Sequence, residues 1–169
     1  MLDFNKLLPD LIDLSSKASN AIMDVYNSDF SHENKDDGSP LTIADESSNN
    51  ILIDGLKEIT PQVQVISEET FKNDISYEDS YWLIDPLDGT KEFINKNGEF
   101  TINIALINHK YPVVGYVYLP VNQILYAGGL YKGSIKCFNS TIKEISTSTY
   151  QDPIRVVVSR NHFNNETKN

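Results

Sequence analysis

The N-terminal part of the chain has apolar residues at the spacing of two helices. From about residue 4 to about residue 27 they recur at intervals of three and four, which predicts an amphipathic helix. The polar residues of 27–40 then predict a loop. A second helix is predicted to open near Ala44 and Asp45. Its buried residues are expected to be Ile51, Leu52, Leu56 and Ile59.

Short apolar runs in the rest of the chain predict β-strands. The runs 63–66 and 81–84 read as buried strands, and acidic residues follow each of them directly. The polar segment 71–80 between them predicts a surface loop. Further strands are predicted over 100–107, 112–118, 123–127, 131–138 and 154–158. Turn residues at 108–110, 120–122 and 128–129 indicate an antiparallel meander. We therefore expect an α+β fold with two helices packed on a largely antiparallel sheet.

Composition and charge narrow the range of partners. The chain has 169 residues, 40% of them hydrophobic, which describes an ordinary globular protein. Its net charge of −10 disfavours a nucleic-acid polymer as partner and gives no support to peripheral association with an anionic membrane. A small anionic substrate would need a metal ion to offset this charge.

Cysteine usage and the N-terminal residues bear on the compartment. Cys137 is the only cysteine, so no intramolecular disulfide is possible. The first residues include Asp3 and Asp10 instead of a basic segment, and no apolar run reaches membrane-spanning length. We expect a cytoplasmic protein.

The candidate chemistry is concentrated in one segment, 84–90. Asp85 and Asp88 flank a proline, so their carboxylates and the Leu87 carbonyl could converge on one hard cation. Gly89 and Thr90 are predicted to open a short helix whose free amides favour an anion. Aspartates beside proline and glycine also occur simply as turn residues. Spacing alone leaves both interpretations open.

Longer motifs around this segment resemble a known family. Ser67-Glu68-Glu69 and the run 82–93 are similar to the signature of the inositol monophosphatase superfamily, and the continuation 97–107 narrows the resemblance to one branch. Lys91-Glu92 after the turn resembles its CysQ-type 3'(2'),5'-bisphosphate nucleotidase branch. Segments 39–45 and 158–162 also resemble family landmarks. The resemblance implies the layered α/β sandwich of these phosphatases and lithium-sensitive, magnesium-dependent hydrolysis, with two or three Mg²⁺ ions in a complete protein.

The resemblance also implies roles for individual residues. Glu68, Asp85 and the Leu87 carbonyl match ligands of a first metal ion, and Asp85 and Asp88 would share a second. Glu68 and Thr90 would orient the attacking water, and Asp45 would assist a weaker third ion. The amides of Gly89 and Thr90, and that of Asp88 as a further candidate, would hold the phosphate. Glu68, Leu87 and Asp88 would complete the substrate-binding residues. Lys35 matches a lysine of a mobile loop near the site.

The resemblance implies a small phosphorylated nucleotide as substrate. The reaction would remove the 3'-phosphate of 3'-phosphoadenosine 5'-phosphate to give AMP, a clearance step linked to sulfate assimilation. An inositol monophosphatase or other sugar-phosphate phosphatase is the alternative within the same class. The family's later Trp-Asp motif has no match here, so we expect residues 1–169 to be a single N-terminal domain, with its core at about 1–150 and the C-terminal α/β domain absent. A non-catalytic remnant that binds metal or phosphate is the alternative of another class.

Overall fold

The computed structural model describes residues 4–28, 40–71, 76–129, 133–149 and 153–157. They form three helices and seven strands. The elements are α1 (Phe4–Tyr26), α2 (Pro40–Ile59), β1 (Gln64–Ser67), β2 (Ser80–Asp88), α3 (Thr90–Ile94), β3 (Thr101–Asn108), β4 (Tyr111–Leu119), β5 (Ile124–Gly129), β6 (Gly133–Phe138) and β7 (Thr141–Ile145).

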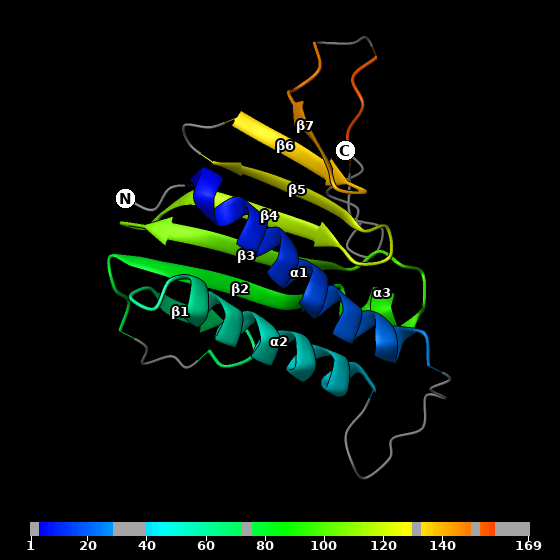
Figure 1. Cartoon of the computed structure of the whole chain (residues 1–169). Helices are drawn as coiled ribbons and strands as arrows, with labels where there is room; N and C mark the ends of the chain where they lie inside the picture. Colours follow the sequence, from blue (N-terminus) through cyan, green and yellow to red (C-terminus); the bar gives the residue numbers. More distant parts are fainter. Residues whose placement is uncertain (1–3, 29–39, 72–75, 130–132, 150–152, 158–169) are drawn as a thin grey trace, which may run out of the picture.

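The two long helices lie side by side on one face of the sheet (Figure 1). Leu11, Ile22 and Leu52 from their inward faces are fully buried, as the three- and four-residue spacing predicts. Gly55 allows α1 and α2 to approach closely, since a Cβ at this position would collide with the side chain of Leu14. None of the described helices is both long and apolar enough to span a membrane.

The seven strands form one sheet in sequence order, β1 to β7. β1 and β2 are parallel, and every later pair is antiparallel. This confirms the predicted α+β class and the meander. A parallel pair needs a connection longer than a tight hairpin, and β1 and β2 are separated by residues 68–79 in the sequence.

The core lies between the helices and the covered face of the sheet. Trp82 is fully buried there, and its indole Nε1–H donates a hydrogen bond to Thr60 Oγ1 at 2.8 Å. Thr60 Oγ1 in turn donates to the Leu56 carbonyl at 3.0 Å. This relay satisfies the only indole N–H of the chain, and it connects the end of α2 to the middle of β2.

Several element boundaries differ from those predicted. α2 begins at Pro40, not near Ala44, because the fixed φ and missing N–H of proline suit a first helical turn. β2 continues through Asp88, although the sequence predicted that it ends at Ile84. β5 continues through Gly128 and Gly129, where a turn was expected.

The C-terminal predictions are partly wrong. Residues 154–157 form no strand, and Val157 is 97% exposed, because an apolar run becomes a strand only where a neighbouring strand offers ladder hydrogen bonds. β7 was not predicted. Its signal is the preceding Asn139-Ser140 turn, in which both residues have positive φ, as two-residue hairpin turns require. Residues 131–132 and 158 of the predicted strands lie outside the described residues.

The Trp82–Thr60 hydrogen bond gives a test of the core. In Thr60→Val the shape is kept but the buried indole N–H loses its acceptor, so we expect a loss of about 1–3 kcal/mol in the free energy of unfolding. Urea denaturation followed by circular dichroism measures it. Thr141→Val, at an exposed position on β7, is the control and should change stability by less than about 0.5 kcal/mol. Equal effects of the two substitutions would contradict the assigned hydrogen bond.

Candidate active site

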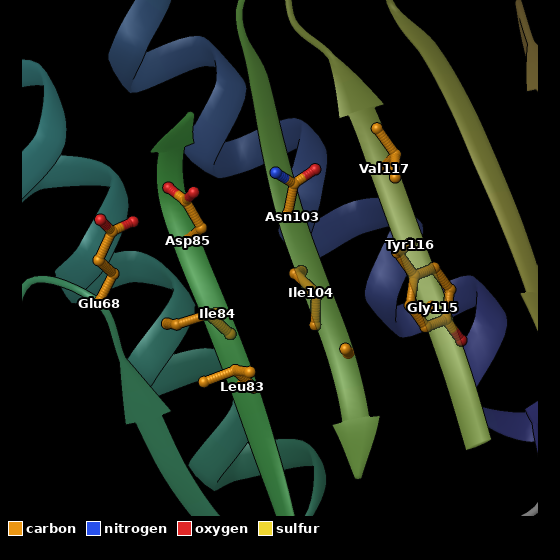
Figure 2. A pocket seen from close by; sticks show the side chains of 10 residues that line it. Glu68, Leu83, Ile84, Asp85, Asn103, Ile104, Gly115, Tyr116 and Val117 are labelled. Carbon is orange, nitrogen blue, oxygen red and sulfur yellow. The ribbon is translucent and has the colours of Figure 1, made fainter. Parts of the chain in front are cut away.

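Parallel pairing brings the acids that follow β1 next to those of β2. Ser67 is paired with Ile84, so Glu68, which directly follows β1, lies next to Asp85 within β2. The Glu68 N–H extends the ladder by donating to the Ile84 carbonyl at 3.0 Å. Figure 2 shows Glu68, Asp85 and Asn103 in a row across the sheet. Two segments that are separate in sequence thus place their carboxylates at one edge.

A β-bulge in β2 brings Asp85 and Asp88 to the same face. Asp85 pairs with Asn103 and Asp88 pairs with Thr101, so three steps along β2 match two steps along β3. Residues two apart on a strand share a face, whereas residues three apart normally do not. The extra residue of the bulge removes this conflict, because Thr101 and Asn103 face the same way. Asn103 Nδ2 also donates to Asp88 Oδ2 at 3.0 Å.

Proline is compatible with this bulge. It has no N–H to give to the ladder, so within sheets it is found at edges and bulges. Pro86 and Leu87 are both buried, whereas Asp88 is exposed and Asp85 is half-buried. The bulge thus sends the apolar side chains inward and leaves the acids toward solvent. The sequence predicted a turn here, and a bulged strand is what the structure contains.

Asp45 joins these acids from α2. It is only 8% exposed, and its Oδ1 is buried without a hydrogen-bond partner among the described residues. Burial, as the largest cause, and the nearby charges of Glu69, Asp85 and Glu68 together raise the pKa of Asp45 to about 7. A buried carboxylate oxygen without a partner is suited to a cation.

Asp85 is in a similar electrostatic position. Burial is the largest cause that raises its pKa to about 7, followed by the negative charges of Glu68 and Asp88, and the Leu87 N–H opposes the shift. The structure therefore brings three of the predicted acids, Asp45, Glu68 and Asp88, within electrostatic reach of the fourth, Asp85. Without a positive charge between them, these acids repel one another.

The turn after β2 is held by close packing. Gly89 has φ 97°, and a Cβ there would lie 3.0 Å from the Glu99 carbonyl oxygen. α3 follows, as predicted, and Phe93 anchors it in a cluster of rings with Tyr26 and Phe100, at centroid distances of 5.4 Å and 5.4 Å. Thr90 is exposed at the first position of this helix. Gly89 and Thr90 are thus fixed directly beside the acids.

The oxygen chemistry of this cluster fits a hard divalent cation. Carboxylates and a backbone carbonyl are the ligands that Mg²⁺ prefers. Within the described residues no three His, Cys, Asp or Glu side chains converge closely enough to count as a formed metal site. Lys35, which the resemblance connects to the site, and the family landmark at 158–162 lie outside the described residues.

A cavity of about 370 Å³ lies beside Glu68 and Asp85. Side chains of β2, β3 and β4 line it, including the half-exposed Leu83 and Val117. These two side chains point away from the helices (Figure 2). Apart from the acids and Asn103, the lining is apolar. The acid cluster thus borders an open, largely apolar face of the sheet.

Sequence reasoning missed several polar residues that contact the acid-bearing segments. They are Ser48, Asn49, Glu69 and Asn103. Ser48 and Asn49 interrupt the apolar face of α2 close to Asp45, which is a signal that a polar contact lies opposite. Asn103 lies opposite Asp85 only because of the β2–β3 register, for which the sequence holds no separate signal.

The fold and the cluster of acids define an α+β domain with a carboxylate-rich strand edge next to a glycine turn. Residues 5–169 match the inositol monophosphatase family. The chain belongs to this family.

Curated relatives narrow the comparison to one branch. The chain is 41% identical over 172 residues to the 3'(2'),5'-bisphosphate nucleotidase CysQ of Buchnera aphidicola, covering 98% of this chain and 64% of that protein. It is 41% identical over 170 residues to CysQ of Escherichia coli K12, covering 96% of this chain and 67% of the relative. The chain thus spans about two thirds of the length of these relatives.

Solved structures share the fold. CysQ from Bacteroides thetaiotaomicron matches with a TM-score of 0.73 and 32% identity, over 99% of this chain and 68% of that one. An inositol monophosphatase from Zymomonas mobilis matches with a TM-score of 0.72 and 22% identity, over 89% of this chain and 56% of that one. The second likeness shows the fold alone.

The raised pKa of Asp85 predicts how stability depends on pH without metal. The folded chain holds the Asp85 proton up to about pH 7, whereas an ordinary Asp loses it near 3.8. Ionising Asp85 between these values therefore costs folding free energy. Asp85→Asn removes this cost, so in chelator it should be more stable than wild type at pH 8 and similar to it at pH 4.

Thermal denaturation at several pH values, with a metal chelator present, measures this difference. Asp54→Asn, at an exposed position of α2, is the matched control and should follow the wild-type profile. A stability gap between wild type and Asp85→Asn that stays constant from pH 4 to pH 8 would contradict the assignment.

Proposed function

We propose that this chain supports magnesium-dependent hydrolysis of a phosphomonoester, with 3'-phosphoadenosine 5'-phosphate as substrate and AMP and phosphate as products. The observation that carries the proposal is the convergence of Asp85 and Asp88, through the bulge, beside Glu68. The names of the CysQ relatives support the nucleotide substrate. Phosphomonoesters hydrolyse very slowly in water, so a site of this kind must stabilise strong charge.

The residues that would hold Mg²⁺ are the carboxylates of Glu68, Asp85 and Asp88, together with the Leu87 carbonyl. When bound, the cation would supply Lewis-acid stabilisation of phosphate charge and make water a better nucleophile. The unpartnered, buried Oδ1 of Asp45 supports a further, weaker cation contact.

The remaining steps fall to the chain's own groups. We assign to Glu68 and Thr90 the orientation of the attacking water, with the Glu68 carboxylate accepting a hydrogen bond from it. The amides of Gly89, Thr90 and Asp88 would donate to the phosphate oxygens. The water oxygen would form a bond to phosphorus while the ester P–O bond breaks, and the proton that the water gives up would balance the proton that the departing 3'-oxygen takes up. Close packing at Gly89 supports a fixed position for these amides.

Further properties follow from the proposed activity. A small site for hard cations next to the phosphate would be sensitive to lithium. Clearing the bisphosphate nucleotide would link the chain to sulfate assimilation in the cytoplasm, where a lone cysteine stays reduced. Cys137 is buried, in agreement with a structural role for this thiol.

The activity itself is tested by phosphate release from 3'-phosphoadenosine 5'-phosphate with and without Mg²⁺. We expect Mg²⁺-dependent turnover, and we expect Asp85→Asn to lower it by at least about a hundredfold because a shared ligand is lost. Asp54→Asn should leave turnover unchanged. No turnover by the folded wild-type chain would instead favour a non-catalytic protein that binds metal or phosphate.

The choice of substrate is a separate test. We expect a higher kcat/KM for the bisphosphate nucleotide than for inositol 1-phosphate, as the CysQ relatives suggest. Steady-state kinetics with both substrates at the same Mg²⁺ concentration measure the ratio. Equal or faster turnover of inositol 1-phosphate would replace the nucleotide with the alternative substrate class.

A further inference from the structure

One face of α2 is directed at both acid-bearing segments. Asp45, Ser48 and Asn49 are three and four residues apart, so they lie together on this helix. All three are buried. Polar side chains are rarely buried without a partner, and Ser48 and Asn49 each have one in the sheet.

Ser48 holds the bulge of β2. Its Oγ donates a hydrogen bond to the Pro86 carbonyl at 2.9 Å, across 38 positions of sequence. A bulge leaves its extra residue outside the regular ladder, so a buried carbonyl there needs another donor. The bond fixes the Pro86–Leu87 peptide plane. The next peptide carries the Leu87 carbonyl and leads to Asp88.

Asn49 holds the segment that follows β1. Its Oδ1 accepts a hydrogen bond from Ser67 Oγ at 2.6 Å, and the Glu69 N–H donates to the same Ser67 Oγ at 3.3 Å. This short relay fixes the backbone on both sides of Glu68. Adjacent residues of one helical turn therefore hold the two segments that supply Glu68, Asp85 and Asp88.

We propose that Ser48 and Asn49 are positioning residues that set the spacing between the Glu68 segment and the bulge of β2, and thereby the affinity for a divalent cation. The inference rests on the proposed function, because it concerns the cation that these acids would bind. Neither side chain needs to touch the cation or the substrate. Their effect is to hold mutually repelling carboxylates close enough to share one positive charge.

Ser15 offers a matched control in the same helical layer. It is a fully buried serine of α1, and its Oγ has no hydrogen-bond partner within the described residues. Ser15→Ala and Ser48→Ala therefore remove the same atom from equally buried positions. Only the second removes a hydrogen bond to the bulge.

The experiment measures Mg²⁺ binding by calorimetric titration, together with backbone hydrogen exchange in metal-free buffer, on the full chain. Ser48→Ala and Asn49→Ala should each weaken Mg²⁺ binding by roughly 10–100-fold, as loss of residues that orient ligands does. Exchange should accelerate locally at 67–69 for Asn49→Ala and at 85–88 for Ser48→Ala. Ser15→Ala should match wild type in both measurements. Ser48→Thr keeps the hydroxyl and should retain binding.

Each alternative outcome is decisive. If wild type binds Mg²⁺ and the two variants bind it as Ser15→Ala does, the positioning role is overturned while the proposed function stands. Wild type that binds no Mg²⁺ would overturn both. Where Ser48→Ala or Asn49→Ala does not fold, Ser67→Ala removes the Asn49 bond from the opposite side, and its unchanged Mg²⁺ affinity would likewise overturn the proposal.

Discussion

The β-bulge between Asp85 and Asp88 is the constraint on which the candidate site depends. Side chains three apart on a regular strand point to opposite faces, so a regular β2 would separate the two acids. Because of the extra residue, Asp85 pairs with Asn103 and Asp88 pairs with Thr101, two positions of β3 that share a face. Burial of Pro86 and Leu87 keeps the bulge in register, because a slip by one residue would expose these side chains and bury an acid.

The rest of the domain offsets the electrostatic repulsion among the clustered acids. Burial and neighbouring carboxylates raise the pKa values of Asp45 and Asp85 to about 7, so gathering these acids costs folding free energy when they are ionised. The apolar core under the helices and hydrogen bonds such as Trp82 to Thr60 offset this cost. A functional site that is locally unfavourable and held by a stable scaffold is a common arrangement.

The sequence predicted elements better than their ends. Periodicity located both long helices and the meander, since burying one face of each element requires the spacing of three and four or of two. It placed the end of β2 too early because Pro86 normally interrupts a strand, and it predicted a strand over 154–158 that has no partner in the described part of the chain. Both errors arise because strand ends depend on which strands pair, and a local residue pattern does not predict this pairing.

By itself, the sequence determined which residues could carry the chemistry. Glu68, Asp85 and Asp88 are candidates because acids directly follow two apolar runs and the second run leads into a glycine turn. Spacing alone left turn residues as an equal interpretation, and the resemblance to family motifs favoured the metal site. Only the tertiary structure decided that they meet. Parallel pairing of β1 with β2, the bulge opposite β3 and the contacts from Ser48 and Asn49 join segments far apart in the chain. The physical reason is that strand register and helix packing depend on contacts between two elements. The spacing of residues along one element does not predict which residues of another element it contacts.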